Sequence, residues 1–298
     1  MICLAYHFGV AKAMKQTIAL FGAGGKMGCR ITDNFKDTSN RILYVEVSPA
    51  GVERLASRGL TVTPQAEAIA IADVAILALP DSLIGKVAPS IIPGLKPGAM
   101  VICLDPAAPY GGELPERVDL AYFITHPCHP PVIHDETEKD AQLDFFGAIK
   151  AKQHIVCALM QGTESDYAKG EALAREMFAP VMEAYRVTVE QMAILEPALS
   201  ETVAATCFVI IREAMDEAVR RGVPEAAARA FILGHMKVNI GIVFNFINSP
   251  FSDGALMAIE RGKKSLFKPD WKDVFKPENV LAEIKAITEG TSLAQKRQ

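Results

Sequence analysis

Short apolar runs that alternate with helix-like segments constrain the fold of this chain most strongly. Between Thr17 and Gly162 the runs have the length of buried strands, and they are TIALFG, RILYVEV, ADVAILALP, AMVICLD, LAYFITHP and QHIVCALMQ. Strands that alternate with helices predict a parallel sheet covered by helices on both faces. After Gly162 long helical segments take over, roughly at 164–178, 188–221, 224–246 and 254–290. We therefore expect an α/β domain at residues 14–162 and an all-α domain at residues 163–298.

Charge and cysteine usage exclude several classes of protein. The net charge is −4 and the isoelectric point is near 5.9, so the chain lacks the basic surface that nucleic-acid binding needs. The 6 cysteines are scattered and form no CxxC pair, which favours free thiols in a reducing compartment over disulfides or a structural zinc site. We expect a cytoplasmic protein that binds neither nucleic acid nor a membrane.

The first residues, MICLAYHFGVAKA, precede Met14 and the first predicted strand. They have no basic start and are too short to span a bilayer. We interpret residues 1–13 as a disordered N-terminal extension outside the fold.

A glycine-rich motif, GAGGKMG, joins the first predicted strand to the first helix. Glycines at such a junction allow a tight turn and let the backbone approach a pyrophosphate on the helix N-terminus. The spacing reads better as GxxGxxG than as GxGxxG. The context of strand, glycines and helix predicts a Rossmann-type dinucleotide site formed by Gly22, Ala23, Gly24, Gly25, Lys26, Met27 and Gly28.

Glu46 stands near the end of the second predicted strand, where a carboxylate accepts a hydrogen bond from the adenosine ribose. A carboxylate at this place repels a 2′-phosphate, so the sequence favours NAD over NADP. Later strands end in ALPD and LDPAAP, whose backbones should line the nicotinamide side. Asp81 is either a cofactor-binding residue or simply the first residue of a helix.

The stretch THPCHPP follows the LAYFI strand and therefore lies at the carboxyl edge, where open α/β sheets bind ligands. Pro127 and Pro130 should push His126 and His129 into extended or polyproline conformation, with both imidazoles on one face. Two imidazoles there can bind a metal or transfer protons. The alternative is a stiff loop with solvated histidines. Nothing beside Cys128 marks it as a nucleophile.

The helical part contributes two polar residues on apolar helices. Glu196 falls within an apolar stripe, where a carboxylate is costly unless it is paired, hydrogen-bonded or metal-bound, and Pro197 should kink the helix beside it. His235 lies in the segment 224–246, which is apolar almost all round and therefore central or at a subunit interface. His235 is either a satisfied core histidine or an acid–base group.

Six segments in this order resemble the D-apionate oxidoisomerase family: GAGGKMG, LALPD, DPAAPYGGELPER, THPCHPP, IVCALMQG and EQMAILEPALSE. The resemblance covers Met14 to the C-terminal region. It implies a Rossmann domain followed by a helical domain akin to that of 6-phosphogluconate dehydrogenase. Lys237 and Asn239 fall near the place of a hydroxyacid-dehydrogenase lysine, but the surrounding glycines do not match that pattern.

The resemblance also implies the reaction. NAD oxidises D-apionate, a small branched sugar acid, at C2, and an acyloin shift of a hydroxymethyl group from C3 to C2 gives 3-oxo-isoapionate. A divalent ion helps such a shift. We assign the ion, Zn, Mn or Mg, to His126 and Glu196, with His129 as a ligand or acid–base group and His235 as a base.

Two other functions remain open. One is a plain NAD-dependent hydroxyacid dehydrogenase for another small sugar acid, and the other is a non-catalytic NAD-sensing module. A product assay separates the first from an oxidoisomerase, because only the latter rearranges the carbon skeleton. The apolar segment 224–246 suggests a homodimer.

Overall fold

The computed structural model describes residues 15–289, so the expected extension at residues 1–13 lies outside the described part of the chain. The chain forms two compact units. The first comprises the residues up to Ala193 together with those from Ile284 onward, and the second is Ile194–Glu283. The first unit therefore extends beyond Gly162, where the sequence predicted its end.

In the described residues, the first unit is built on a 7-stranded sheet in the order β2-β1-β3-β4-β5-β6-β7. The strands are β1 (Thr17–Phe21), β2 (Arg41–Val45), β3 (Val74–Leu77), β4 (Met100–Cys103), β5 (Ala121–Pro127), β6 (Gln153–Gln161) and β7 (Val181–Arg186). Every residue of β3 and β4 is buried, as expected for apolar strands covered on both faces. The predicted α/β sheet is confirmed.

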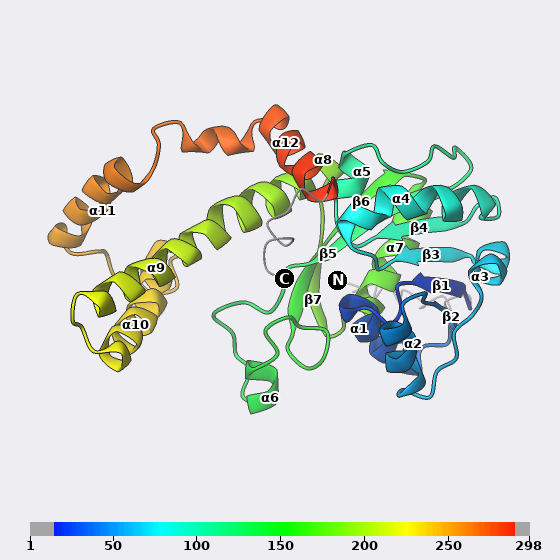
Figure 1. Ribbon diagram of the computed structural model, residues 1–298, viewed down its shortest axis with the longest axis horizontal. Helices are drawn as coiled ribbons and strands as arrows, with labels where there is room; N and C mark the ends of the chain where they lie inside the picture. The colour runs from blue at the N-terminus through cyan, green and yellow to red at the C-terminus, as the bar shows by residue number, and fades with distance from the viewer. Residues whose placement is uncertain (1–14, 290–298) are drawn as a thin grey trace, which may run out of the picture. The chain divides into compact units, whose positions relative to one another are not determined.

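Helices cover both faces of this sheet (Figure 1). One hydrophobic cluster takes in residues of α1 (Lys26–Asn34), α2 (Pro49–Ala56) and α7 (Glu164–Met177). The other takes in residues of α3 (Gln65–Ile71), α4 (Asp81–Ile91), α5 (Ala107–Tyr110) and α8 (Val189–Ala193). The short 3₁₀ turns η1 (Phe35–Asp37) and η2 (Ile92–Gly94) extend α1 and α4. The carboxyl ends of β1, β3, β4 and β5 thus lie at one edge of a rigid, buried scaffold.

The sheet departs from the prediction at β6, which pairs antiparallel with β5. β7 is parallel to β6, so that both strands run opposite to β5. The connection between β5 and β6 is residues 128–152, which we call the arm, and its only described helix is the short α6 (Lys139–Gln142). A parallel pair needs a long crossover, usually a long helix, whereas the arm has only the single turn of α6. The arm therefore begins and ends near the carboxyl end of β5.

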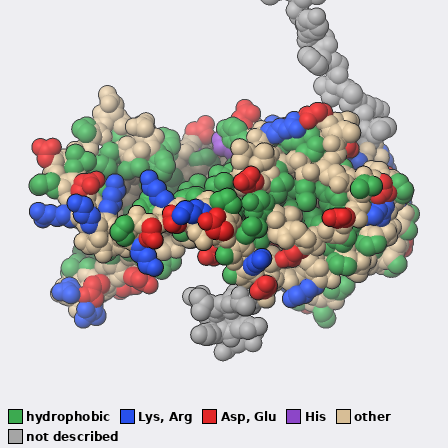
Figure 2. Space-filling view, turned by 90° about the horizontal axis from the view of Figure 1, so that it is seen from above, with side chains coloured by type: hydrophobic (Ala, Val, Ile, Leu, Met, Phe, Trp, Pro, Cys, Tyr) green, Lys and Arg blue, Asp and Glu red, His purple; other side chains and the backbone are tan. Residues whose placement is uncertain are grey.

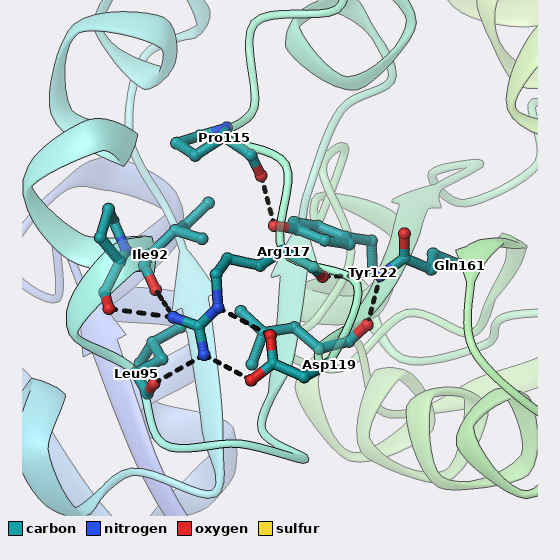
Figure 3. A network of polar contacts seen from close by, with 9 residues as sticks. Ile92, Leu95, Pro115, Arg117, Asp119, Tyr122 and Gln161 are labelled. Carbon is teal, nitrogen blue, oxygen red and sulfur yellow. Dashed lines mark hydrogen bonds and ion pairs between the residues drawn. The ribbon is translucent and has the colours of Figure 1, made fainter.

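Arg117 ties the end of α4 to the start of β5 (Figure 3). Its guanidinium donates to the carbonyls of Ile92, Pro93 and Leu95 at 3.2, 2.9 and 3.2 Å and pairs with Asp119 at 2.7 Å. The last carbonyls of a helix have no partner within the helix, and an arginine commonly supplies one. This contact fixes the C-terminal end of α4 at the amino edge of the sheet, opposite the edge that carries the site.

The second unit is helical. It contains a π-helical segment η3 (Ile194–Ala205), α9 (Thr206–Arg220), α10 (Glu225–Val243), α11 (Asp253–Leu266) and the 3₁₀ turn η4 (Trp271–Phe275), and α12 (Pro277–Thr288) leads back into the first unit. The all-α region predicted after the sheet is confirmed. The kink expected at Pro197 takes the form of a π-helix, in which the carbonyl hydrogen bonds skip one residue further along.

Two stretches, Val189–Arg220 and Glu225–Val243, are long and apolar enough to cross a membrane by length and composition, a test that helices of soluble proteins also pass. Many of their apolar side chains are exposed, among them Phe208, Phe231 and Leu233. In Figure 2, apolar side chains lie among charged ones over the helical unit. Within the described residues, 15–289, the segment 224–246 is therefore not a core helix.

Candidate active site

A cavity of about 320 Å³ opens at the carboxyl edge of the sheet in the first unit. The order of β2, β1 and β3 reverses the direction of the crossovers at this point, and open α/β sheets bind ligands there. The cavity is lined by residues of the glycine motif and of the segments after β3, β4 and β5, including Lys26, Met27, Asp81, Leu104, Asp105 and His126. The structure thus brings the predicted nucleotide motif and the first histidine of THPCHPP to one cavity.

The glycine motif has the close packing that its residues predict. Gly22 has a φ of +75°, and a Cβ there would meet the carbonyl of Ala78. A Cβ on Gly24 would collide with the backbone of Gly51, and one on Gly28 with the carbonyl of Gly22. Gly25 precedes the first residue of α1, so the backbone is open at the positive end of that helix.

Glu46 follows β2 and holds the glycine motif in place. Its carboxylate accepts hydrogen bonds from the amide of Gly24 at 2.9 Å, from the amides of Val47 and Ser48 at 2.9 and 2.8 Å, and from the Ser48 hydroxyl at 2.9 Å. Partial burial raises the pKa of this carboxyl, but the four hydrogen bonds outweigh it and the pKa is lowered. Glu46 is therefore a fixed negative charge beside the expected place of the ribose.

We expect Glu46→Gln to narrow the preference for NAD over NADP about tenfold or more, because it removes the charge that repels a 2′-phosphate. The measurement is kcat/KM with each cofactor. Glu53→Gln is the matched control, since Glu53 is an exposed carboxylate of α2. An unchanged ratio in Glu46→Gln, or an equal change in Glu53→Gln, would contradict this assignment.

Asp81 is the first residue of α4, as one interpretation of the sequence holds, and it also lines the cavity. A carboxylate in the first turn of a helix is stabilised by the helix dipole. Its role in cofactor binding stays a prediction.

His126 is a half-buried residue near the end of β5, and its ring faces Asp105, which follows β4. The Nδ1 atom of His126 lies 2.8 Å from the carbonyl oxygen of Leu104 and 3.7 Å from the Asp105 carboxylate. A carbonyl only accepts, so Nδ1 carries the proton and the neutral ring has its lone pair at Nε2. Burial raises the pKa of Asp105, against the lowering effect of His126. The pair offers one imidazole nitrogen and one carboxylate as metal ligands or as an acid–base couple.

The prediction for the backbone of His129 was wrong. Its φ is +62°, in the left-handed region, although a residue before proline was expected to be extended. The Nδ1 atom donates to the carbonyl of Phe146 at 2.9 Å, a contact from the far end of the arm that holds this conformation. The rings of His126 and His129 still lie 6.2 Å apart between centroids. The two predicted imidazoles are therefore neighbours, by a different backbone path.

Glu196 and His235 lie in the second unit. Glu196 is half-buried in the π-helical segment, but Leu195 and Leu199 of its predicted apolar stripe are exposed. His235 is exposed on α10, stacks on Phe231 at 4.0 Å between ring centroids and donates from Nδ1 to the Phe231 carbonyl at 2.9 Å. His235 is thus not a core histidine within the chain, and its role as a base stays a prediction.

Sequence reasoning missed Asp105. The segment LDPAAP was recognised as a strand end, but only its backbone was given a role. The usable signal was that Asp105 follows β4 and His126 lies near the end of the adjacent parallel strand β5, so that both side chains reach the same edge.

Comparison with known proteins agrees with this geometry. The family model described as phosphogluconate dehydrogenase (decarboxylating) C-term matches residues 134–288. A protein named D-apionate oxidoisomerase from Rhizobium rhizogenes is 55% identical over 272 residues, which cover 91% of this chain and 99% of that protein. A protein of the same name from Cupriavidus necator is 51% identical over 276 residues, which cover 92% of this chain and 100% of that protein.

A solved structure is similarly close. The crystal structure of a semialdehyde dehydrogenase NAD-binding protein from Cupriavidus necator, in complex with calcium and NAD, superposes with a TM-score of 0.90 and 51% identity over 92% of this chain and 100% of that one. Identity of this extent over nearly the whole chain shows the family. The chain belongs to the D-apionate oxidoisomerase family of NAD-dependent oxidoreductases.

Proposed function

We propose that this chain converts D-apionate and NAD into 3-oxo-isoapionate and NADH. Oxidation at C2 removes two electrons and a proton as hydride, and the hydroxyl proton is released. The hydroxymethyl group then moves from C3 to C2, so that the C3 hydroxyl becomes the ketone and the C2 ketone becomes the new tertiary hydroxyl. The observation that carries the proposal is the Asp105–His126 pair on the wall of the nucleotide cavity, in a chain 55% identical to a D-apionate oxidoisomerase.

For the cofactor, we propose that the glycine motif holds the pyrophosphate of NAD and that Glu46 accepts the ribose hydroxyl. When bound there, NAD accepts the hydride. The close packing of Gly22, Gly24 and Gly28 supports this, because side chains at these positions would occupy the space next to the backbone. The relative from Cupriavidus necator was crystallised with NAD.

For the metal, we propose that Asp105, His126 and Glu196 hold one divalent cation. The Nε2 lone pair of His126 and two carboxylates form a donor set that suits Zn or Mn better than Mg. The same relative was crystallised with calcium, which is itself a divalent ion bound by oxygen ligands. A divalent ion stabilises negative charge on a ketone or alkoxide oxygen and lowers the pKa of a bound hydroxyl.

Chain connectivity supports a role for Glu196. Met192 is fully buried in the same hydrophobic cluster as Ile124 of β5 and Val156 of β6, and Ala193 ends the first unit. A chain covers at most about 3.6 Å per residue, so the Cα of Glu196 lies within about 11 Å of that of Ala193. The carboxylate is therefore tethered to the part of the sheet that carries His126.

His129 is our acid–base group. Its Nδ1 is occupied by the Phe146 carbonyl, so that Nε2 is the atom that takes the proton of a substrate hydroxyl. The left-handed backbone of His129 is a conformation that L-residues rarely adopt, and such conformations gather at functional sites. His235, whose Nδ1 is likewise occupied, is the second candidate base.

The test is the product formed from D-apionate by the purified protein. We expect NADH and product in equal amounts, and a carbon-13 spectrum with the rearranged skeleton of 3-oxo-isoapionate. NADH with an unrearranged 2-oxo acid would mean a plain dehydrogenase. No NADH from D-apionate would overturn the proposed substrate.

We further propose a homodimer formed by the helical unit. The hairpin of α9 and α10 encloses an apolar groove of about 440 Å³, lined among others by Ile211, Met215 and Phe231. Exposed apolar surface of this size between charged residues is typical of a subunit interface. We expect a dimer in sedimentation velocity and a monomer for Phe231→Asp with Leu233→Asp, and a wild-type monomer would contradict the proposal.

A cytoplasmic location fits this chemistry. The described cysteines, Cys29, Cys103, Cys128, Cys157 and Cys207, are all free thiols. Burial raises the pKa of Cys103 to about 12. We propose that the enzyme works in the reducing cytoplasm, where such thiols persist.

A further inference from the structure

Two cations of α1 contact one aromatic ring of the arm. The Nζ atom of Lys26 lies 4.0 Å from the centroid of the Phe146 ring, and the guanidinium carbon of Arg30 lies 4.8 Å from it. Lys26 is the first residue of α1 and Arg30 stands one turn later, so both project from the same face of the helix. A single ring from residues 128–152 therefore orients both charges.

This arrangement is unfavourable for the protein alone. The N-terminal end of a helix carries a partial positive charge, where cations are destabilising and acids are normally found. The first turn of α1 contains no acidic residue, and like charges four residues apart repel each other. Among residues 15–289, the contacts of Lys26 and Arg30 are with the ring and not with a carboxylate. Such uncompensated charge is expected where an anion binds.

The position of Lys26 indicates which anion. Lys26 lines the cavity together with Gly25 and Met27 of the glycine motif, where the proposed function places the dinucleotide pyrophosphate. A ring contact orients a cation through the quadrupole of the ring and leaves its N–H groups able to donate to phosphate oxygens. Two cations match the two negative charges of a pyrophosphate.

We propose that Lys26 and Arg30 bind the pyrophosphate of NAD and that Phe146 is the positioning residue that holds both cations for it. The inference rests on the proposed function for the site of NAD, and it adds Arg30 and a residue of the arm to that site. Asp144 closes the turn that carries Phe146, because its carboxylate accepts the amides of Ile149, Lys150 and Ala151 at 3.2, 3.0 and 3.2 Å.

The same residue connects the cofactor to the histidines. The carbonyl of Phe146 accepts the hydrogen bond from His129 Nδ1 at 2.9 Å, and the ring of His129 lies beside that of His126. Ordering of Phe146 by cofactor-bound cations thus also orders His129. We expect amide hydrogen exchange in residues 144–151 to slow when NAD binds.

The experiment compares Phe146→Leu with Phe146→Tyr, which keeps an aromatic ring, and with Phe145→Leu, a neighbouring and highly exposed phenylalanine as matched control. Binding of NAD, ADP-ribose and adenosine to the full-length protein is measured by calorimetry without substrate. Phe146→Leu should lower the affinity for NAD and for ADP-ribose about threefold to tenfold, and it should leave the affinity for adenosine within about twofold of wild type. Phe146→Tyr and Phe145→Leu should bind like wild type.

Arg30→Gln, which retains the ring, should show the same selective loss. In steady-state assays, Phe146→Leu should raise KM for NAD more than it lowers kcat. Wild-type affinity for ADP-ribose in Phe146→Leu, or an equal loss for adenosine, would overturn the proposal. If NAD and ADP-ribose fail to bind wild-type protein, the proposed function itself fails, so the two failures are distinguishable.

Discussion

Replacing His126 by alanine is expected to lower kcat/KM for D-apionate by a hundredfold or more. His126 presents Nε2 at the cavity because Nδ1 is held by the Leu104 carbonyl at 2.8 Å, and alanine removes the only nitrogen donor of the proposed metal set. Loss of a ligand that stabilises charge in the transition state costs several kcal/mol, and each 1.4 kcal/mol is about tenfold in rate. The assay is NADH formation at saturating NAD.

His134→Ala is the matched control, since His134 is an exposed histidine of the arm and should be neutral. Asp105→Asn and Glu196→Gln should lower kcat/KM for D-apionate about as much as His126→Ala does. Elemental analysis should also find less metal bound to these two variants. Removal of metal with a chelator should abolish the rearranged product, and Zn or Mn should restore it. Full activity of His126→Ala or of stripped protein would reject the metal site and leave the pair as an acid–base couple or as structure.

Gly28→Ala is expected to abolish NAD binding and to destabilise the first unit. A Cβ at this position would overlap the carbonyl of Gly22 and the backbone of Ala23, and backbone atoms cannot move aside as a flexible side chain can. Overpacking of this kind costs about 1–3 kcal/mol in stability. It also pushes the glycine motif away from α1, so that the pyrophosphate loses its backbone contacts.

The measurements are the midpoint of urea unfolding and the affinity for NAD. Gly254→Ala is the control: it lies in α11, a Cβ there meets nothing within 4 Å, and alanine is the better helix former. Gly254→Ala should leave the urea midpoint unchanged or raise it slightly, and it should leave the affinity for NAD unchanged. Wild-type NAD affinity in Gly28→Ala would show that the cofactor does not rest on this turn.

The sequence predicted most of the sheet because its strands are buried on both faces and therefore read as continuous apolar runs. β7 escaped prediction because its residues are only partly buried, so Val181–Arg186 lacks such a run. The antiparallel pairing of β6 was missed for another reason. Strand direction depends on the connection, and residues 128–152 contain only the short helix α6 in place of a long crossover helix. The helical segments 164–178, 188–221 and 224–246 were located to within a few residues by their apolar periodicity, whereas the region 254–290 divides into α11 and α12 with η4 between them.

The site was predictable where position in a motif determines position in space. The glycine motif, Glu46 and His126 follow strands and reach the carboxyl edge as expected. The conformation of His129 was not predictable, because a tertiary contact with Phe146 overrides the local preference before proline. Asp105 became a candidate only when the pairing of β4 with β5 set it beside His126.

The antiparallel connection between β5 and β6 has a consequence for how such enzymes diversify. Residues 128–152 leave the sheet and return to the neighbouring strand, so the arm can change length while β5 and β6 stay paired. The entropy of closing a flexible loop grows only with the logarithm of its length, and doubling the loop costs about 0.6 kcal/mol. A crossover helix would instead have to keep its packing on the sheet. Insertions and deletions in the arm can therefore reshape the surroundings of His129 at little cost to the stability of the fold.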